Sequence, residues 1–323
     1  MKYLLKTKLL IISCFHNRVA EVENSVDSVV SQLTPEMHFV VVDDGSTDGT
    51  SEALDQWENR DGKNVTVIHQ KNMGFVNSLI YHINNIDCEY IAIHGAGDIS
   101  YEGRFSKQIV LLDFDKKLGV VSSRVNNINS YDNAKTITGS AFSGNAEKIL
   151  LKQNIINHGA VCFRKDIYLK AGGYRSFFEF AQDRDLWCRM SHFCEFRVID
   201  DILYERVSNA KNSVSGSPEK RIRQKLLSNL ASFCHDMRLK GKSDPLKQYG
   251  YFSIYMLSKD KKLEREIFML ALSAIKHKKR ESFSIYFDAH EKISSLSISK
   301  LLLVLLNKML PTRYWQSGNG KIK

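Results

Sequence analysis

The feature that most constrains the fold of this chain is an alternation of apolar runs and amphipathic segments over its first hundred residues. Continuous apolar runs of this kind suit parallel strands that are buried on both faces. There are four of them: Leu9–Ile12, Phe39–Val42, Val65–Ile68 and Tyr90–Ile93. Residues 21–33, 51–57 and 74–83 lie between them and read as helices. The pattern predicts an α/β domain with a mostly parallel sheet.

Three of the predicted strands end in polar loops. Their sequences are SCFHNR at residues 13–18, DDGS at 43–46 and HGAGDIS at 94–100. Ligands of open parallel sheets bind beyond the carboxyl ends of the strands. A single acid in a turn usually has a structural role, but three loops at one edge of a sheet predict a functional site.

The rest of the chain suggests a second region. Residues 154–164 read as a loop that runs into a strand, and a helix is expected to begin near Asp183. From about Lys220 the sequence is mostly helical, and the polar stretch 208–218 is the expected boundary. We therefore expect one domain over residues 1–216 and a basic helical region over residues 217–323. The six cysteines form no CxxC pair, which argues against a zinc motif and suits reduced thiols.

The two regions differ in charge. The net charge of the chain is +10, and residues 218–323 hold 22 Lys and Arg against 9 Asp and Glu. With apolar Leu301–Leu306 and the aromatic Tyr314 and Trp315, this tail suits a helix lying on an anionic membrane. A solvated helical surface with surplus lysine is an equal alternative. A nucleic-acid partner is not expected, because the chain has no aromatic RNA motif or recognition-helix pattern.

No segment reaches the roughly 20 apolar residues that a membrane-spanning helix needs. The amino-terminal run imitates a short signal peptide, but no small-residue cleavage site follows it. We therefore expect a cytoplasmic protein, with the basic tail placing it peripherally at the inner face of the plasma membrane.

Four motifs, in order, resemble glycosyltransferase family 2, and the resemblance covers about residues 8–216. They are VVVDDGSTDGT at 40–50, NMG at 72–74, GAGDISYEGR at 95–104 and GGYRSFFEFAQDRDLW at 172–187. The resemblance implies a GT-A fold, a nucleotide-sugar donor and transfer with inversion at the anomeric carbon. Because the processive signature QxxRW is absent, we expect single additions.

The resemblance assigns the nucleotide-sugar site to residues on several loops. In the family the second acid of the DDGS pair, here Asp44, contacts the base, and Ser13 assists. Asn17 matches a polar position of the first loop, Arg104 a common arginine that touches phosphate or pairs with an acid, and His158 a loop near the active site. The structural alternative is that Asp44 only ends its strand and caps the next helix.

The metal loop departs from the family pattern. The family has Asp-X-Asp-Asp, whereas Gly95 and Gly97 stand here in place of two acids and Asp98 remains. One carboxylate with diphosphate oxygens can hold Mg²⁺ or Mn²⁺, because such ions readily keep water ligands. We expect Asp98 to be the sole protein carboxylate on this ion. The alternative is that Asp98 only caps the segment near Tyr101 and that transfer needs no metal.

Asp183 is the candidate general base. The Glu-Asp pair of the family becomes Gln182-Asp183, so the acid that would take the acceptor proton is kept. An acid at a helix start is also an ordinary cap. Ser213 and Ser215 lie where related enzymes have a segment that closes over the diphosphate.

The sequence thus predicts an inverting glycosyltransferase that uses a nucleoside-diphosphate sugar, with UDP or dTDP favoured. The expected acceptor is a lipid-linked intermediate of a surface polysaccharide, of capsule or O-antigen type. Two alternatives stay open: a transferase for a protein or small-molecule acceptor, and a non-catalytic subunit that binds nucleotide sugars.

Overall fold

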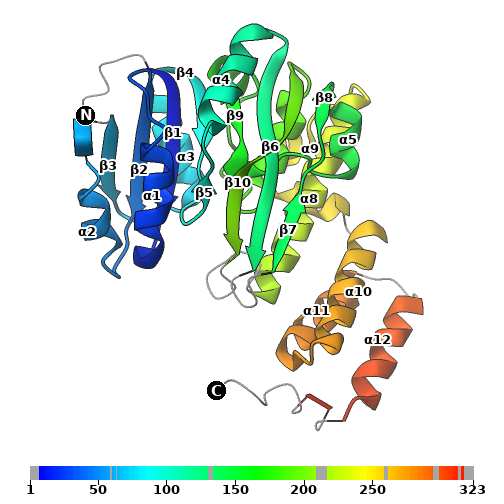
Figure 1. Cartoon of the computed structure of the whole chain (residues 1–323). Coiled ribbons are helices and arrows are strands. Elements are labelled where there is room, and N and C mark those ends of the chain that lie inside the picture. The colour runs from blue at the N-terminus through cyan, green and yellow to red at the C-terminus, as the bar shows by residue number, and fades with distance from the viewer. Residues whose placement is uncertain are drawn as a thin grey trace. The chain divides into compact units, whose positions relative to one another are not determined.

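The computed structural model describes residues 7–58, 60–62, 64–129, 134–208, 217–257, 261–293, 298–311 and 314–315 (Figure 1). The chain divides into two compact units, Met1–Asn209 and Ala210–Lys323. Ser213 and Ser215 lie outside the described residues.

Unit 1 is built on one mixed sheet. Its main path runs β3-β2-β1-β4-β9-β6-β10-β5, with β7 on β6 and β8 on β10. The strands are β1 (Thr7–Phe15), β2 (Met37–Asp44), β3 (Val65–Gln70), β4 (Cys88–Ile93), β5 (Ile99–Ser100), β6 (Leu118–Asn129), β7 (Lys135–Thr138), β8 (Phe142–Gly144), β9 (Cys162–Arg164) and β10 (Glu195–Ser208). Strands β1 to β4 pair in parallel, as do β6 and β10, while β9 runs antiparallel between the two groups. The carboxyl ends of β1, β2, β3 and β4 therefore share one edge.

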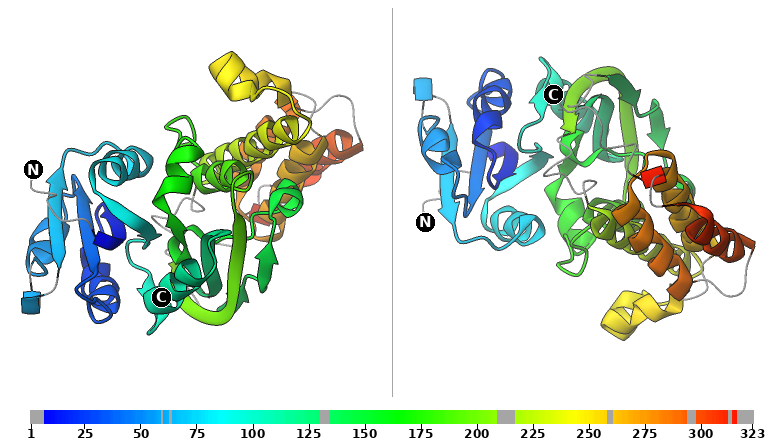
Figure 2. Two further views of the ribbon diagram at one scale, coloured as in Figure 1. Left: turned by 90° about the horizontal axis from the view of Figure 1, so that it is seen from above. Right: turned by 90° about the horizontal axis from the view of Figure 1, so that it is seen from below.

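Helices cover both faces of β1 to β4 (Figures 1 and 2). The helices of unit 1 are α1 (Val22–Val30), α2 (Thr50–Asp55), α3 (Phe75–Asn85), α4 (Arg104–Phe114), α5 (Glu147–Lys152), α6 (Lys165–Lys170) and α7 (Gln182–Met190), with short 3₁₀ turns η1 (Val19–Glu21), η2 (Arg60–Gly62) and η3 (His158–Ala160). Along β1, Leu10 packs with Leu79 of α3 on one face, and Ile11 packs with Val26 of α1 on the other. Burial on both faces explains the continuous apolar runs within these strands.

The α/β prediction is confirmed, but the sequence did not indicate two long strands. Both β6 and β10 carry many polar side chains, and β10 shifts register against β6 between Ile199 and Tyr204. Such strands lack the continuous apolar run by which β1 to β4 are recognised. The helix predicted near Asp183 is present as α7.

Unit 2 is helical in its described part. It contains α8 (Pro218–Leu239), α9 (Pro245–Tyr249), η5 (Gly250–Leu257), α10 (Lys261–Lys276), α11 (Arg280–Ile293) and α12 (Ile298–Met309). Its core includes Ile267, Phe283, Leu303 and Trp315. None of the helices in the described ranges has the length and apolar character needed to cross a membrane.

The aromatic residues at the end of unit 2 do not have the exposed position that the sequence suggested. Trp315 is buried and stacks on Phe283 with ring centroids 5.5 Å apart. Tyr314 is half-buried, and its hydroxyl donates to the Ile275 carbonyl at 3.0 Å. They belong to the helical core and are not free to meet a membrane. Part of α12 does stay exposed, namely Leu301, Leu302, Leu305 and Met309.

Candidate functional site

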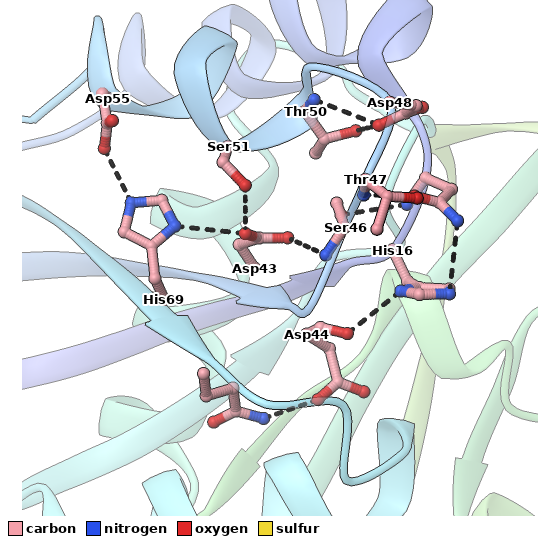
Figure 3. Close-up of polar contacts among 12 residues, drawn as sticks. His16, Asp43, Asp44, Ser46, Thr47, Asp48, Thr50, Ser51, Asp55 and His69 are labelled. Carbon is pink, nitrogen blue, oxygen red and sulfur yellow. Dashed lines mark hydrogen bonds and ion pairs between the residues drawn. The ribbon is translucent and has the colours of Figure 1, made fainter.

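The polar loops that follow β1 and β2 come together at one edge of the sheet (Figure 3), and the loop after β4 joins them through Ser25. The Asn17 amide donates to Ser46 Oγ at 3.0 Å, and the Thr47 amide donates to Asn17 Oδ1 at 2.8 Å. The Arg18 amide donates to Thr50 Oγ1 at 2.8 Å. These bonds join the first two loops, and we use the name loop cluster for residues 13–18, 43–50 and 94–98.

The third loop is tied to the helix that follows the first. The Gly97 amide donates to Ser25 Oγ at 3.0 Å, and the same hydroxyl is 3.0 Å from His94 Nε2. The other ring nitrogen of His94 is 3.0 Å from Ser100 Oγ. Burial lowers the pKa of His94 to about 3, so this ring is neutral and serves as an internal brace.

Asp43 holds the second loop to its own helix and strand. Its carboxylate accepts from the Ser46 amide at 3.0 Å, from Ser51 Oγ at 2.5 Å and from His69 Nδ1 at 3.1 Å. Burial alone would raise the pKa of Asp43, but hydrogen bonds from these three residues outweigh it and lower the pKa. The pKa of His69 is raised by hydrogen bonds to Asp43 and to Asp55 (Figure 3). Asp43 therefore has a structural role.

Asp44 pins the segment between β3 and α3. Its Oδ1 accepts from Gln70 Nε2 at 2.7 Å and from the Met73 amide at 2.9 Å, and Ser78 Oγ lies 3.3 Å away. Its Oδ2 accepts from the Gly74 amide at 2.9 Å. Only 4% of Asp44 is exposed. The side chain predicted to meet the base thus shapes the loop cluster through the chain's own amides, and Oδ2 is the oxygen with spare acceptor capacity.

Ser13 is the opposite case. It lies in β1, is fully buried, and its Oγ has no hydrogen-bond partner among the residues that the structure describes. Buried hydroxyls are normally paired. Because the chain itself encloses this hydroxyl, a ligand would bond to it only if the surrounding residues moved.

The loop that carries Asp98 turns its one acid inward. Asp98 Oδ2 accepts from the Tyr204 hydroxyl at 2.7 Å, and Oδ1 accepts from the Val207 amide at 3.2 Å. Burial raises the pKa of Asp98 to about 6, although both hydrogen bonds oppose the shift. A Cβ at Gly95 would lie 2.3 Å from Asp98 Oδ2. The glycine that replaces a family acid is thus required by the inward position of Asp98.

Arg104 lies behind this loop and does not reach a ligand surface. It is fully buried, donates to Ser100 Oγ at 2.8 Å and to the Ile93 carbonyl at 2.7 Å, and lies 4.8 Å from the Tyr204 ring centroid. Burial lowers its pKa to about 10. The prediction that Arg104 touches phosphate is therefore corrected here, because its guanidinium is enclosed by the loop that it supports.

The donor set for a metal is small. Within the described ranges, no group of three or more His, Cys, Asp and Glu side chains is placed to hold an ion. Asp98 is the single acid of its loop and is only partly buried. One carboxylate fits an ion such as Mg²⁺ or Mn²⁺ that keeps waters and takes its other ligands from phosphate oxygens. It does not fit zinc, which takes three or four protein ligands, mostly nitrogen and sulfur.

Asp183 occupies the first turn of α7. Its Oδ2 accepts from Asn154 Nδ2 at 2.8 Å, and the side chain is partly exposed. The preceding Ala181 has a φ of 58°, an uncommon backbone conformation for a residue with a Cβ. That left-handed residue turns the chain sharply into α7 and so sets where Asp183 lies.

His158 begins the short 3₁₀ turn η3. Its Nε2 is 2.7 Å from the Tyr174 hydroxyl, and its ring meets Phe75 of α3 edge-on at 5.6 Å between centroids. Burial lowers the pKa of His158, while the nearby Asp183 charge opposes that shift. The position agrees with a supporting residue beside the candidate base rather than a proton carrier.

Sequence comparisons place residues 10–168 within a known family. They match the family model described as Glycosyl transferase family 2. EpsE of Bacillus subtilis is 26% identical over 187 residues, which cover 56% of this chain and 66% of that protein, slightly under two thirds. The O-antigen biosynthesis glycosyltransferase WbnJ of Escherichia coli is 25% identical over 188 residues, covering 57% of this chain and 72% of WbnJ.

Solved structures with low identity share the fold. TarS 1–349 from S. aureus, in complex with UDP-GlcNAc, is 13% identical with a TM-score of 0.58, covering 94% of this chain and 92% of that one. The mannosyltransferase PcManGT from Pyrobaculum calidifontis, in complex with GDP-Man and Mn²⁺, is 18% identical with a TM-score of 0.53, covering 98% of this chain and 84% of that one. The likeness agrees with the GT-A fold class that the sequence predicted.

Proposed function

This chain belongs to glycosyltransferase family 2, and from that premise we propose that it moves one sugar from a nucleoside-diphosphate sugar to a hydroxyl of a glycan acceptor. The observation that carries the proposal is the placement of Asp183. A partly exposed carboxylate stands at the start of α7, oriented by Asn154, in the same unit as the loop cluster. An acid that is available to solvent and held by one neighbour suits a general base.

The proposed step is a single displacement with inversion. The acceptor oxygen forms a bond to the anomeric carbon while its proton goes to the Asp183 carboxylate. The bond between that carbon and the diphosphate oxygen breaks, and its electron pair leaves with the diphosphate. Ser13, Asn17 and Asp44 would bind or shape the site for the nucleoside, with His158 supporting the sugar side. Arg104 would contribute only by holding the loop of Asp98.

We further propose that Asp98 holds a divalent ion together with the diphosphate. When bound, the ion would stabilise the charge that grows on the leaving diphosphate. Because the protein offers one carboxylate, the ion would bind well only when the nucleotide supplies phosphate oxygens. The Mn²⁺ seen with GDP-Man in PcManGT supports a divalent ion in this fold.

The experiment is calorimetric titration with UDP, dTDP and GDP, each with and without Mn²⁺. We expect base-selective binding that Mn²⁺ strengthens and that Asp98→Ala makes indifferent to Mn²⁺. Mn²⁺ alone should bind weakly. Nucleotide binding that does not respond to Mn²⁺ would contradict the role of the ion but not the transferase activity. The absence of any nucleotide binding would favour the non-catalytic alternative.

The acceptor that we propose is a lipid-linked intermediate of a surface polysaccharide. The O-antigen assignment of WbnJ supports it, and the net positive charge of unit 2 suits an acceptor embedded in an anionic membrane. A protein or small-molecule acceptor is the alternative. Sugar transfer that occurs with membrane extracts, and that is lost when solvent extraction removes the lipids, would favour the lipid-linked acceptor.

We propose that unit 2 meets that membrane through α12 at the inner face of the plasma membrane. Leu301 and Leu305 are 56% and 54% exposed one helical turn apart, and Lys300 and Lys308 lie on the same helix. Apolar side chains beside lysines suit the boundary between headgroups and acyl chains.

Co-sedimentation with phosphatidylglycerol vesicles tests this contact. The double variant Leu301→Glu, Leu305→Glu should lose vesicle binding. The matched control is Val110→Glu with Phe114→Glu, an exposed pair with the same spacing on α4 of unit 1. Equal binding by both variants would remove the membrane from the proposal and leave the solvated helical surface.

A further inference from the structure

A cavity of about 310 Å³ opens in unit 1 among β6, the β7–β8 connection and the segment after α5. Its size falls within the range of roughly 300–1,000 Å³ that small-molecule sites occupy. It is separate from the loop cluster, because none of the residues that line it belongs to those three loops. The cavity therefore needs its own explanation.

The lining is polar but uncharged. Hydroxyl and amide side chains supply the polar part: Ser123, Thr138, Ser140, Gln153, Asn154 and Asn157. Phe142 and Ile149 contribute apolar surface. Among the described residues that line it, none is an acid, a base or a histidine. Amides and hydroxyls both donate and accept hydrogen bonds, so they match sugar hydroxyls, while the apolar side chains match the C–H face of a pyranose ring.

One side chain connects this cavity to the candidate base. Asn154 lines the cavity, and its Nδ2 donates to Asp183 Oδ2 at 2.8 Å. Its Oδ1 accepts from the Ile156 amide at 3.2 Å, which fixes the orientation of the amide group. For proton transfer, an acceptor hydroxyl at this end of the cavity would have to reach the other Asp183 oxygen, Oδ1, beside the Asn154 amide, because a base acts only within hydrogen-bond distance.

We propose that this cavity binds the acceptor sugar and selects a sugar without charge. The inference rests on the proposed function, since it takes Asp183 as the base. A carboxylate or phosphate in the cavity would lose its hydration, find no cation in the lining and face the Asp183 charge. A neutral pyranose meets none of these penalties. Asn154 is then a positioning residue that presents one acceptor hydroxyl to Asp183.

The test uses simple glycosides and needs no knowledge of the donor. Saturation-transfer NMR of the full chain is recorded with methyl glucoside, methyl galactoside and methyl glucuronide. Ala141→Trp fills the cavity from the exposed connection between β7 and β8. Ile137→Trp is the matched control, because Ile137 is 52% exposed on β7 and does not line the cavity.

We expect at least one neutral glycoside to bind, the glucuronide to bind at least about tenfold more weakly, and Ala141→Trp alone to remove the binding. Equal binding of the glucuronide would overturn the charge selectivity. Binding that survives Ala141→Trp, or no glycoside binding at all, would overturn the cavity as the acceptor site.

Nucleotide titration of the same samples separates this inference from the proposed function. If Ala141→Trp keeps the wild-type nucleotide affinity while glycoside results contradict the cavity, only the inference fails. If the wild-type chain binds no nucleotide, the proposed function itself fails. Glycoside binding without nucleotide binding would mark the cavity as a sugar site of a non-transferase.

Discussion

The loop cluster and the cavity beside Asp183 belong to one unit but differ in how much open volume their polar residues line. In the loop cluster the polar groups mostly bond to neighbouring side chains and amides of the protein itself, as Asp43, Asp44 and Asn17 do. Around the cavity, Ser123, Thr138 and Asn157 also hydrogen-bond within the protein, but they line open volume. The described residues give Asp183 one hydrogen-bond partner, Asn154. A pre-organised region suits a ligand with fixed chemistry, whereas an open region can change its ligand by changing a few side chains.

The largest expected effect comes from a substitution at Asp183, on the cavity side of this comparison. Asp183→Asn should reduce transfer by about 10²–10⁴-fold, since the amide cannot take the acceptor proton. The nucleotide affinity should stay unchanged, because Asp183 lies outside the loop cluster. Steady-state transfer and calorimetry measure the two quantities, with Glu179→Gln as an exposed control. Retained turnover, or loss of nucleotide binding, would contradict the role of the base.

The next largest effect concerns Asp44 in the loop cluster. Asp44→Asn should lower the free energy of unfolding by about 1–3 kcal/mol, because the NH₂ group that replaces one carboxylate oxygen cannot accept from the backbone amide, of Met73 or of Gly74, that it faces. Nucleotide affinity should fall in parallel. Urea unfolding gives the first quantity, and Asp27→Asn on α1 is an exposed control. An unchanged unfolding free energy would mean that the loop cluster is less interdependent than its hydrogen bonds indicate.

A smaller effect follows from the pKa of Asp98. Burial raises this pKa to about 6, so protons compete with an ion for the carboxylate below that pH. The strengthening of nucleotide binding by Mn²⁺ should therefore fall by about tenfold between pH 7.5 and pH 5. Calorimetry at both pH values measures it, and Asp98→Ala should show no such change. A constant Mn²⁺ effect would separate Asp98 from the ion.

The smallest effect tests the edge of the loop cluster. Hydrogen bonds to Asp43 and Asp55 raise the pKa of His69, so its contribution to stability is complete below the ordinary value of 6.5 and is lost as pH rises through the raised pKa. His69→Gln should thus destabilise the protein more at pH 6 than at pH 9. Because His69 is 43% exposed, the difference should stay under about 1 kcal/mol. Thermal unfolding at the two pH values measures this difference, and a larger destabilisation at pH 9 than at pH 6 would contradict the prediction.

The sequence predicted the half of unit 1 whose signals are local. Continuous apolar runs identified β1 to β4, and the polar loops after β1, β2 and β4 do converge. Arg104 shows where local reasoning ends. An arginine at a helix start suggests a surface group, and its burial depends on Tyr204, a hundred residues later.

The same limit explains the cavity and the tail. The cavity draws on β6, two short strands and the segment after α5, none of which carries a recognisable motif, so only folding brings their amides together. Trp315 reads as an interfacial aromatic in the sequence, but it is the partner of Phe283, thirty-two residues earlier. Spatial pairs of this kind leave no periodic trace in one sequence.

Ala181 holds a positive φ directly before α7, at a cost of roughly 1–2 kcal/mol that glycine would not incur. An engineer who wants a longer-lived catalyst would therefore be drawn to Ala181→Gly. The same exchange would loosen the turn that sets the position of Asp183 and so trade turnover for shelf life. Thermal stability and turnover thus both depend on the methyl group of Ala181. Screening a library of variants only for heat resistance would select the slower enzyme.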